Sequence, residues 1–386
     1  MTHRERFLRT YRFQEVDHVP DMEFGYWDDT FLRWHKEGLP EQINDNTIAD
    51  KYFGFAPVLE VPVNLGLLPP FETQVIEETD RHRTYIDGAG VTCMVMKDGS
   101  DTIPRYVDWT LKTRDDWEAF KERLNPDDPA RYPDNWDEIA EKANNSTVPV
   151  QVPCGSLFGV IRDWMGFENV LIALMEQRDW IEEMMEHLTG LYISVLEQVS
   201  KHVHIDCGTF WEDMCFKGGP MISPKLFREL MTPRYKRITD VLKRAGCDIF
   251  IVDSDGDITQ LVEHWIAGGV NCMFPLEIAA GTDPFQLRRD YGQEVLLLGG
   301  VNKRELAKDK QAIRAEVDRI VPLVEQGGYI PHVDHRVPPD VSYENYLYYL
   351  QYKREALGIP DPWANGRPEN LLDHFKDTVS AQYMAM

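Results

Sequence analysis

The sequence has few basic residues, no long apolar run and no closely spaced cysteine pair. Lys and Arg number 41 against 65 Asp and Glu, a formal net charge of −24, so we expect no nucleic-acid partner, because phosphate binding requires clustered basic side chains. No apolar run approaches the roughly 20 residues that span a bilayer, so we expect no membrane partner either. Residues 1–6 have no apolar signal core, and we expect a cytoplasmic protein. The six cysteines lack CxxC spacing, which is typical of reduced thiols rather than of disulfides or a thiolate zinc site.

The sequence also lacks a GxGxxG turn, a Walker loop and an HExxH motif. From about residue 148 onward, apolar strand-like runs alternate with helical patterns, which predicts a parallel sheet with helical crossovers. Polar residues follow nearly every predicted strand: Glu23, Glu212 with Asp213, Asp253 with Asp255, Glu277, Lys303, and Asp334 with His335. Contributions from so many strands favour a closed (β/α)8 TIM barrel over an open sheet with one crevice.

The first third of the chain has a different texture. Residues 72–97 are predicted to be extended strands around a glycine-containing turn at 87–90, a good hairpin signal. We interpret residues 72–111 as an antiparallel elaboration inserted into or laid over the barrel. Residues 1–386 are therefore expected to form a single α/β domain.

Two strand ends stand out because each apolar run breaks abruptly into ionisable residues. They are residues 250–257 (FIVDSDGD) and 331–335 (PHVDH). Burying unpaired charge is costly, and barrel enzymes place acids, bases and metal ligands at the carboxyl ends of their strands. These segments are therefore the predicted active site.

Several motifs resemble the uroporphyrinogen decarboxylase superfamily over nearly the whole chain. They are residues 4–7 (RERF) with 17–20 (DHVP), 223–227 (SPKLF) with 233–235 (PRY), 299–303 (GGVNK), and 339–340 (PD) with 344–345 (EN). The resemblance implies a (β/α)8 barrel with a deep cleft at the carboxyl strand ends. It also implies one of two chemistries: cofactor-independent decarboxylation of uroporphyrinogen acetate arms, or zinc-dependent methyl transfer between a corrinoid and a thiol.

The sequence departs from both patterns. The arginine-rich motif that binds substrate carboxylates in the decarboxylases is matched here by residues 21–27 (DMEFGYW), whose acidic residues would repel a polycarboxylate. By position, the zinc-binding His-x-Cys pair of the thiol methyltransferases falls on Asp253 and Asp255, and the later Cys near Asp334 or His335. Carboxylates and an imidazole would hold Mg, Mn or Zn without selecting among them. Alternatively, Asp253, Asp255 and Asp257 form a turn that caps a helix at residue 258.

Other candidate residues have two interpretations each. Glu212 and Asp213 alternate faces, so only one points inward, as a general acid or base. His335 resembles in position a histidine of the decarboxylase cleft, whereas His332 faces the other side of its strand and is a weaker candidate. Arg162 would anchor a substrate carboxylate or neutralise Glu168. Glu277 would bind substrate or form an ion pair with Lys303 or Arg288. The predicted substrate-binding residues are Glu23, Arg162, Glu277, Lys303 and His332.

The leading hypothesis is metal-assisted methyl transfer involving a corrinoid or a small methylated substrate. The metal would lower the pKa of the acceptor, and Glu212 or Asp213 would handle a proton. The alternatives are a decarboxylase in which His335 and a carboxylate protonate a carbanion, and a non-catalytic binding barrel. Expected cofactors are a divalent metal and a corrinoid supplied by a partner protein. Candidate partners are a small-molecule substrate, that corrinoid protein and a second copy of the chain.

Overall fold

Seven parallel strands form the central sheet of the computed structural model, which describes residues 1–97 and 103–366. In spatial order they are β1 (Leu59–Glu60), β6 (Val150–Gly155), β7 (Cys207–Trp211), β10 (Ile249–Asp253), β11 (Cys272–Phe274), β12 (Leu296–Leu298) and β13 (Tyr329–Ile330). Every residue of β10, β11 and β12 is buried, as expected for parallel strands covered on both faces. The alternation from residue 148 onward thus predicted the parallel sheet.

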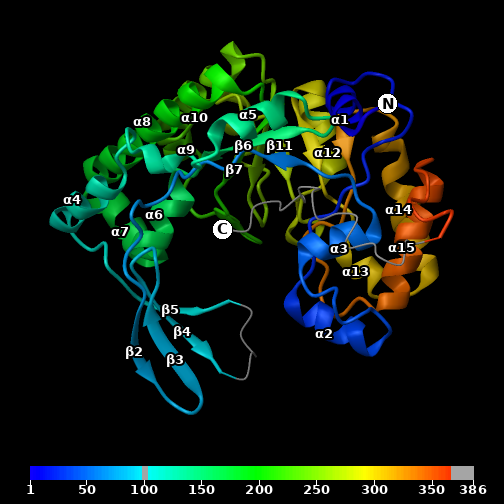
Figure 1. The fold of residues 1–386 in the computed structure, drawn as a ribbon, viewed down its shortest axis with the longest axis horizontal. Helices are drawn as coiled ribbons and strands as arrows, with labels where there is room; N and C mark the ends of the chain where they lie inside the picture. The colour runs from blue at the N-terminus through cyan, green and yellow to red at the C-terminus, as the bar shows by residue number, and fades with distance from the viewer. Residues whose placement is uncertain (98–102, 367–386) are drawn as a thin grey trace.

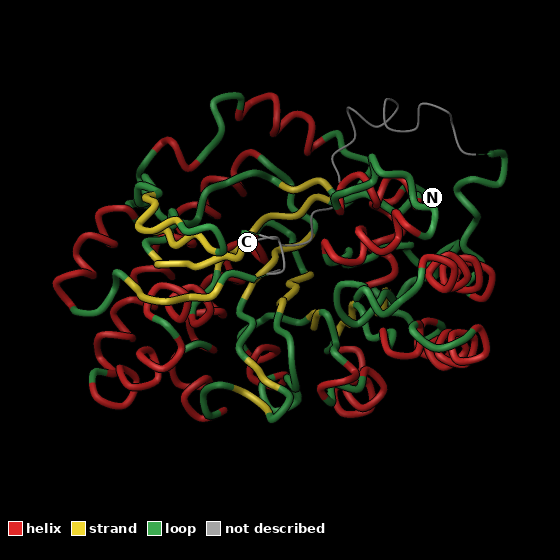
Figure 2. The backbone as a smooth tube through the Cα atoms, turned by 90° about the horizontal axis from the view of Figure 1, so that it is seen from below, coloured by secondary structure: helices red, strands yellow, loops and turns green. Residues whose placement is uncertain are grey.

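Helices surround this sheet (Figures 1 and 2). They are α1 (His3–Tyr11), α2 (Asp28–Lys36), α3 (Asn46–Phe53), α4 (Arg114–Arg123), α5 (Trp136–Asn144), α6 (Phe158–Met165), α7 (Phe167–Glu176), α8 (Arg178–His202), α9 (Pro224–Leu230), α10 (Thr232–Arg244), α11 (Val262–Ala267), α12 (Pro284–Tyr291), α13 (Lys303–Leu306), α14 (Lys310–Val324) and α15 (Tyr343–Ala356). Within the described ranges, no helix is long and apolar enough to cross a membrane.

Two stretches with a continuous helical pattern in the sequence each form two helices in the structure. The stretch 224–244 forms α9 and α10, with Pro233 in the first turn of α10, where its missing N–H costs nothing. Likewise, the stretch 303–325 forms α13 and α14, because the Asp309 side chain caps the backbone N–H groups of Gln311 and Ala312.

The sheet curls as a half-barrel, and an extended segment lies beside its open edge. At residues 21–26, Ala56 N donates to Asp21 O at 2.7 Å and Tyr26 forms an isolated parallel bridge with Val337. This segment therefore connects the β1 side of the sheet to the chain that follows β13. Fully closed eight-stranded pairing stays a prediction, because the described residues form a seven-stranded sheet.

An antiparallel sheet extends away from the parallel sheet at the lower left of Figure 1. Its strands are β2 (Gln74–Glu78), β3 (His82–Ile86), β4 (Val91–Met96) and β5 (Arg105–Trp109). A separate two-stranded hairpin, β8 (Cys215–Phe216) with β9 (Gly219–Pro220), follows β7 in the chain. Trp109 joins the antiparallel sheet to the body, since a Cβ at Gly166 would lie 2.7 Å from its ring. The predicted elaboration is present. The predicted ranges 72–111 and 1–386 include residues 98–102 and 367–386, which lie outside the described residues.

Candidate functional site at the carboxyl ends of the strands

Asp253 ends β10 at the mouth of the half-barrel. In the strand register it lies between Trp211 of β7 and Phe274 of β11, so the three side chains share the inner face of the sheet. Burial raises the pKa of Asp253 well above its usual range, and the nearby carboxylates of Asp255 and Asp213 add to the shift. The Asp253 carboxyl is therefore harder to ionise than an exposed aspartate.

Asp255 and His335 form a pair across the mouth. Oδ2 of Asp255 lies 2.9 Å from Nε2 of His335, and Oδ1 of Asp255 is buried with no hydrogen-bond partner among the described residues. The ring of His335 stacks on Trp27 with centroids 5.4 Å apart and meets Phe24 edge-on at 5.3 Å. The two strand ends that the sequence singled out therefore meet in space, although 80 residues separate them.

Glycine is required between the acidic residues of the 250–257 segment. Gly256 has φ +85°, and a Cβ there would lie 2.5 Å from the carbonyl oxygen of Cys215, so no other residue fits without displacing β8. The Asp257 side chain accepts from Thr259 N at 3.0 Å. Asp257 thus makes a turn contact and Asp255 pairs with His335, and the expected helix start at residue 258 is wrong, because α11 begins at Val262.

Asp213 and Arg162 lie at the same mouth. Burial raises the pKa of Asp213, and Asp255 and Asp163 add to this shift. The guanidinium of Arg162 contacts Asp163 at 3.0 Å, the carbonyl of Asp213 and, at 4.0 Å, the Asp213 carboxylate. It also lies over the ring of Trp211. Most N–H donors of Arg162 thus contact protein groups. Few remain free to anchor a substrate carboxylate, the role predicted from the sequence.

Glu212 faces away from this mouth and stabilises the start of α6. Its carboxylate accepts from the backbone N–H groups of Leu157, Phe158 and Gly159 at 2.7 to 2.9 Å, and from the hydroxyls of Ser156 and Tyr235. Burial raises the pKa of Glu212, while these hydrogen bonds oppose the shift. Of the two neighbouring acids, Asp213 is therefore the one placed with Asp253 and Asp255.

Asp334, Glu277 and Lys303 connect the loops that follow β11 and β12. Asp334 is fully buried, and its two oxygens accept from Ile278 N and Lys303 N at 2.9 Å. The ammonium of Lys303 lies 2.8 Å from Glu277, which also accepts from Gly256 N at 3.2 Å. The sequence left open whether Glu277 binds substrate or forms an ion pair, and in the structure it forms the ion pair with Lys303.

Glu23 and His332 are both fully buried and lie 3.8 Å apart. Glu23 accepts from Val333 N at 3.1 Å and from the hydroxyl of Tyr346 at 3.2 Å. Burial raises the pKa of Glu23 to about 7 and lowers that of His332 to about 3. Nδ1 of His332 lies 2.7 Å from the Val333 carbonyl. Phe24 contacts the rings of both His332 and His335, and substrate binding by Glu23 or His332 stays a prediction.

The predicted metal ligands are only partly assembled. Asp255 and His335 are in contact and Asp253 is near them, but both oxygens of Asp334 are occupied by backbone N–H groups. In the described part of the chain, no group of three or more His, Cys, Asp and Glu side chains is placed to hold a metal ion. The side chains in this arrangement do not fit a resident zinc with three protein ligands, and metal binding stays a prediction.

Arg336 and Trp27 belong to this site and were not found from the sequence. The guanidinium of Arg336 lies 5.7 Å from the Phe24 centroid and 5.3 Å from that of Trp27, and its charge opposes the rise in the pKa of Asp253. The structure gives it no side-chain hydrogen bond to a described residue. Its position directly after His335 was the available signal.

The chain is similar to known proteins at the level of family and of fold. The family model described as Uroporphyrinogen decarboxylase (URO-D) matches residues 91–355. Among solved structures, a methyltransferase from Methanosarcina mazei matches with TM-score 0.57 at 13% identity, over 92% of this chain and 99% of that chain. A B12-independent methionine synthase from Shewanella sp. W3-18-1 in complex with selenomethionine has TM-score 0.37 at 12% identity, over 58% and 67%. No curated protein matches.

The structural likeness to the Methanosarcina protein concerns the fold alone, because 13% identity carries no argument about chemistry. The family match covers more than half of the chain, including β7, β10 and the segment after β13 that build the mouth. This confirms the resemblance inferred from the sequence motifs. The chain belongs to the uroporphyrinogen decarboxylase family.

Proposed function

We propose that this chain is an enzyme that transfers a methyl group from a small methylated compound, at the mouth formed by Asp213, Asp253, Asp255 and His335. Membership of the family supports an enzyme in general terms. The specific reaction is supported by one observation, the buried Asp253 carboxyl beside Asp255 and Asp213. The Asp253 carboxyl makes no side-chain hydrogen bond to a described residue, and its raised pKa suits it to donate a proton.

Methyl transfer from an ether or thioether requires such a donor. The bond between the methyl carbon and the heteroatom breaks, the carbon bonds to a nucleophile, and the heteroatom keeps the electron pair. Burial and the neighbouring carboxylates raise the pKa of Asp253, which favours its protonated form. It therefore transfers that proton to the leaving heteroatom as negative charge develops there. Solvent then returns a proton to Asp253.

His335 orients the substrate. Asp255 holds Nε2 of His335 at 2.9 Å, and the stacked Trp27 fixes the plane of the ring. When one ring nitrogen donates to a carboxylate, the other is left as an acceptor. Nδ1 is thus available to a hydroxyl of the substrate or to water.

The acceptor we propose is a corrinoid supplied by a partner protein, which provides a strong nucleophile toward the methyl carbon. A divalent metal near Asp253, Asp255 and His335 stays part of the hypothesis, and no proton-transfer step above depends on it. Metal analysis of the purified full-length chain, with Asp255→Asn as the comparison, tests that part independently.

The test of the reaction is a screen of O- and S-methylated small compounds with cob(I)alamin, followed by the absorbance of the corrinoid. With an active compound, Asp253→Asn is expected to lower kcat by about 10²- to 10⁴-fold, the usual contribution of a general acid. Asp290→Asn, an exposed aspartate on α12, is the control and should match the parent. Equal rates for Asp253→Asn and the parent would overturn the assignment.

Decarboxylation is the second candidate because of Arg336. Its guanidinium stacks over Phe24 and Trp27 beside the same acids, and its unpaired donors suit a substrate carboxylate. In that reaction the carbon–carboxylate bond breaks, carbon dioxide leaves, and Asp253 protonates the carbanion. Release of carbon dioxide from a panel of small carboxylates, abolished by Arg336→Met, would favour this candidate over methyl transfer.

A further inference from the structure

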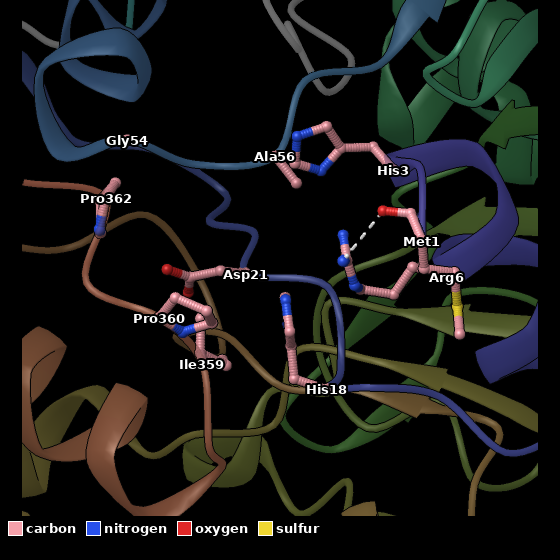
Figure 3. A pocket seen from close by; sticks show the side chains of 10 residues that line it. All are labelled: Met1, His3, Arg6, His18, Asp21, Gly54, Ala56, Ile359, Pro360 and Pro362. Carbon is pink, nitrogen blue, oxygen red and sulfur yellow. Dashed lines mark hydrogen bonds between the residues drawn. The ribbon is translucent and has the colours of Figure 1, made fainter.

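A pocket of about 250 Å³ lies between α1, the segment 18–21 and the chain beyond α15 (Figure 3). Its lining residues are Met1, His3, Arg6, His18, Asp21, Gly54, Ala56, Ile359, Pro360 and Pro362. The proposed reaction gives this pocket no role.

The pocket is at the opposite end of the sheet from Asp253. Arg4 of α1 forms an ion pair with Asp206 at 2.9 Å, and Arg12 forms one with Asp248 at 2.9 Å. Asp206 and Asp248 directly precede β7 and β10, so α1 covers the amino ends of the parallel strands. A ligand here would not occupy the proposed active site.

One wall of the pocket is basic. Figure 3 shows His3, Arg6 and His18 on the same side of the space. Arg6 uses Nε and Nη2 for Asp17 at 2.7 Å, and its Nη1 donates no hydrogen bond to a described residue. His18 places Nδ1 2.9 Å from the Val19 carbonyl, which leaves Nε2 for a ligand. Burial lowers the pKa of His3, and the charges of Arg6 and His18 lower it further, as expected in a region of positive potential.

The acidic groups around the pocket are already neutralised. Asp21 is 2.7 Å from both Lys353 Nζ and Arg354 Nε, and Asp17 is paired with Arg6. Asp21 and Asp17 are thus each paired with basic side chains, and His3, His18 and Nη1 of Arg6 remain to meet a ligand. In a chain with a formal net charge of −24, a pocket lined by His3, Arg6 and His18 whose one lining carboxylate is paired is suited to an anion.

The other wall is largely apolar, with Ile359, Pro360 and Pro362, and the paired carboxylate of Asp21 lies among them (Figure 3). Gly54 brings the chain close to this wall, since a Cβ there would lie 2.5 Å from Pro362. A ligand that fits both walls has a charged oxyanion group and a compact apolar body.

We propose that this pocket is a second ligand site, which binds a small phosphate or carboxylate compound through His3, Arg6 and His18. The oxyanion receives hydrogen bonds from Arg6 Nη1 and the two imidazoles, and the apolar part contacts Ile359 and Pro360. The proposal does not depend on the reaction at the other end of the sheet.

The test is titration calorimetry of the full chain with three probes: inorganic phosphate, phenyl phosphate and benzoate, each against chloride at the same ionic strength. At least one organic probe is expected to bind more tightly than inorganic phosphate because it also contacts the apolar wall. Whichever of phenyl phosphate and benzoate binds more tightly shows whether the pocket prefers a phosphate or a carboxylate.

The double variant His3→Gln with His18→Gln is expected to bind the best probe at least about tenfold more weakly, equivalent to about 1.4 kcal/mol. The matched control is His202→Gln with His204→Gln, two exposed histidines at the end of α8, which should bind as the parent does. Both variants leave the Arg6–Asp17 pair in place, and thermal unfolding of each checks the fold. Binding no stronger than that of chloride, or equal affinity in the His3/His18 variant, would overturn the proposal.

Discussion

Asp213 combines an unusual backbone with an unusual side-chain environment. Its φ is +41°, a region that costs a non-glycine residue free energy, and its carboxyl lies among Asp255, Asp163 and Arg162. The backbone N–H of Asp213 lies 3.2 Å from the Asp253 carbonyl, which holds the two acids in a fixed relation. Strain of this kind is found at functional sites, and it supports the assignment of this mouth.

The proposed role of Asp253 gives a pH dependence with a defined sign. A general acid works in its protonated form, so kcat/KM should fall as pH rises through the pKa of Asp253. The charge of Asp213 is one cause of the raised pKa. In Asp213→Asn, the fall in kcat/KM should therefore occur at lower pH than in the parent.

Arg336 opposes the rise in this pKa, so Arg336→Met should move the same fall to higher pH. Profiles of kcat/KM against pH for the parent and both variants provide the measurement, with Asp290→Asn as the control. Displacement of both variants in the same direction would contradict the electrostatic explanation.

At the scale of elements, α6 depends on a residue from another strand. Its N-cap position, Leu157, makes no side-chain capping hydrogen bond, and Glu212, which follows β7, accepts the first backbone N–H groups of the helix instead. A carboxylate at this end also interacts favourably with the helix dipole. Glu212 thereby fixes α6, and with it Arg162, against the end of β7.

Glu212→Gln should lower the free energy of unfolding by about 1 to 3 kcal/mol, since the new amide group faces backbone donors that lose an acceptor. Urea unfolding measures the loss. Glu325→Gln, at an exposed position after α14, is the control and should change stability little. A loss of equal size in both variants would argue against the capping role.

The segment 21–26 is attached to α15 through Glu23 and Tyr346, and this attachment has its own pH signature. Burial raises the pKa of Glu23 from 4.5 to about 7. Between these values the folded protein retains a proton that the unfolded chain releases, so stability falls as pH rises through this window and is constant above it.

Glu23→Gln does not titrate. The parent should therefore lose on the order of 3 kcal/mol of unfolding free energy, relative to this variant, as pH rises through the window. Denaturant unfolding at several pH values measures this difference, above the pH range in which His332, 3.8 Å from Glu23, changes its charge in the folded protein. Parallel stability curves would show that Glu23 does not keep its proton on folding.

For the whole molecule, the sequence predicted the parallel sheet, the antiparallel elaboration and the two strand ends that meet at Asp255 and His335. Periodicity and residue type carry this information locally. The sequence could not distinguish the role of Glu212 from that of Asp213, because these roles depend on which carboxylate reaches the start of α6. Nor could the sequence identify Arg336 as a site residue, or show that backbone N–H groups occupy both oxygens of Asp334, since both facts depend on contacts between distant segments.

The net charge of −24 also has a consequence for the molecule as a whole. Like charges repel in the folded state more than in the expanded chain, and added salt screens this repulsion. The melting temperature should therefore rise when sodium chloride is added to a low-salt buffer. Scanning calorimetry tests this, with equimolar sucrose as a non-ionic comparison; an unchanged or lower melting temperature in salt would contradict it.

The two ion pairs that attach α1 to the amino ends of the sheet determine when the fold can be completed during synthesis. Arg4 and Arg12 are separated from their partners by 202 and 236 residues. At about 5 to 20 residues per second, the ribosome needs roughly 10 to 50 s to reach Asp248 after making Arg12. Arg6 of the same helix finds Asp17 at once, but Arg4 and Arg12 stay without their partners until the second half of the chain is synthesised.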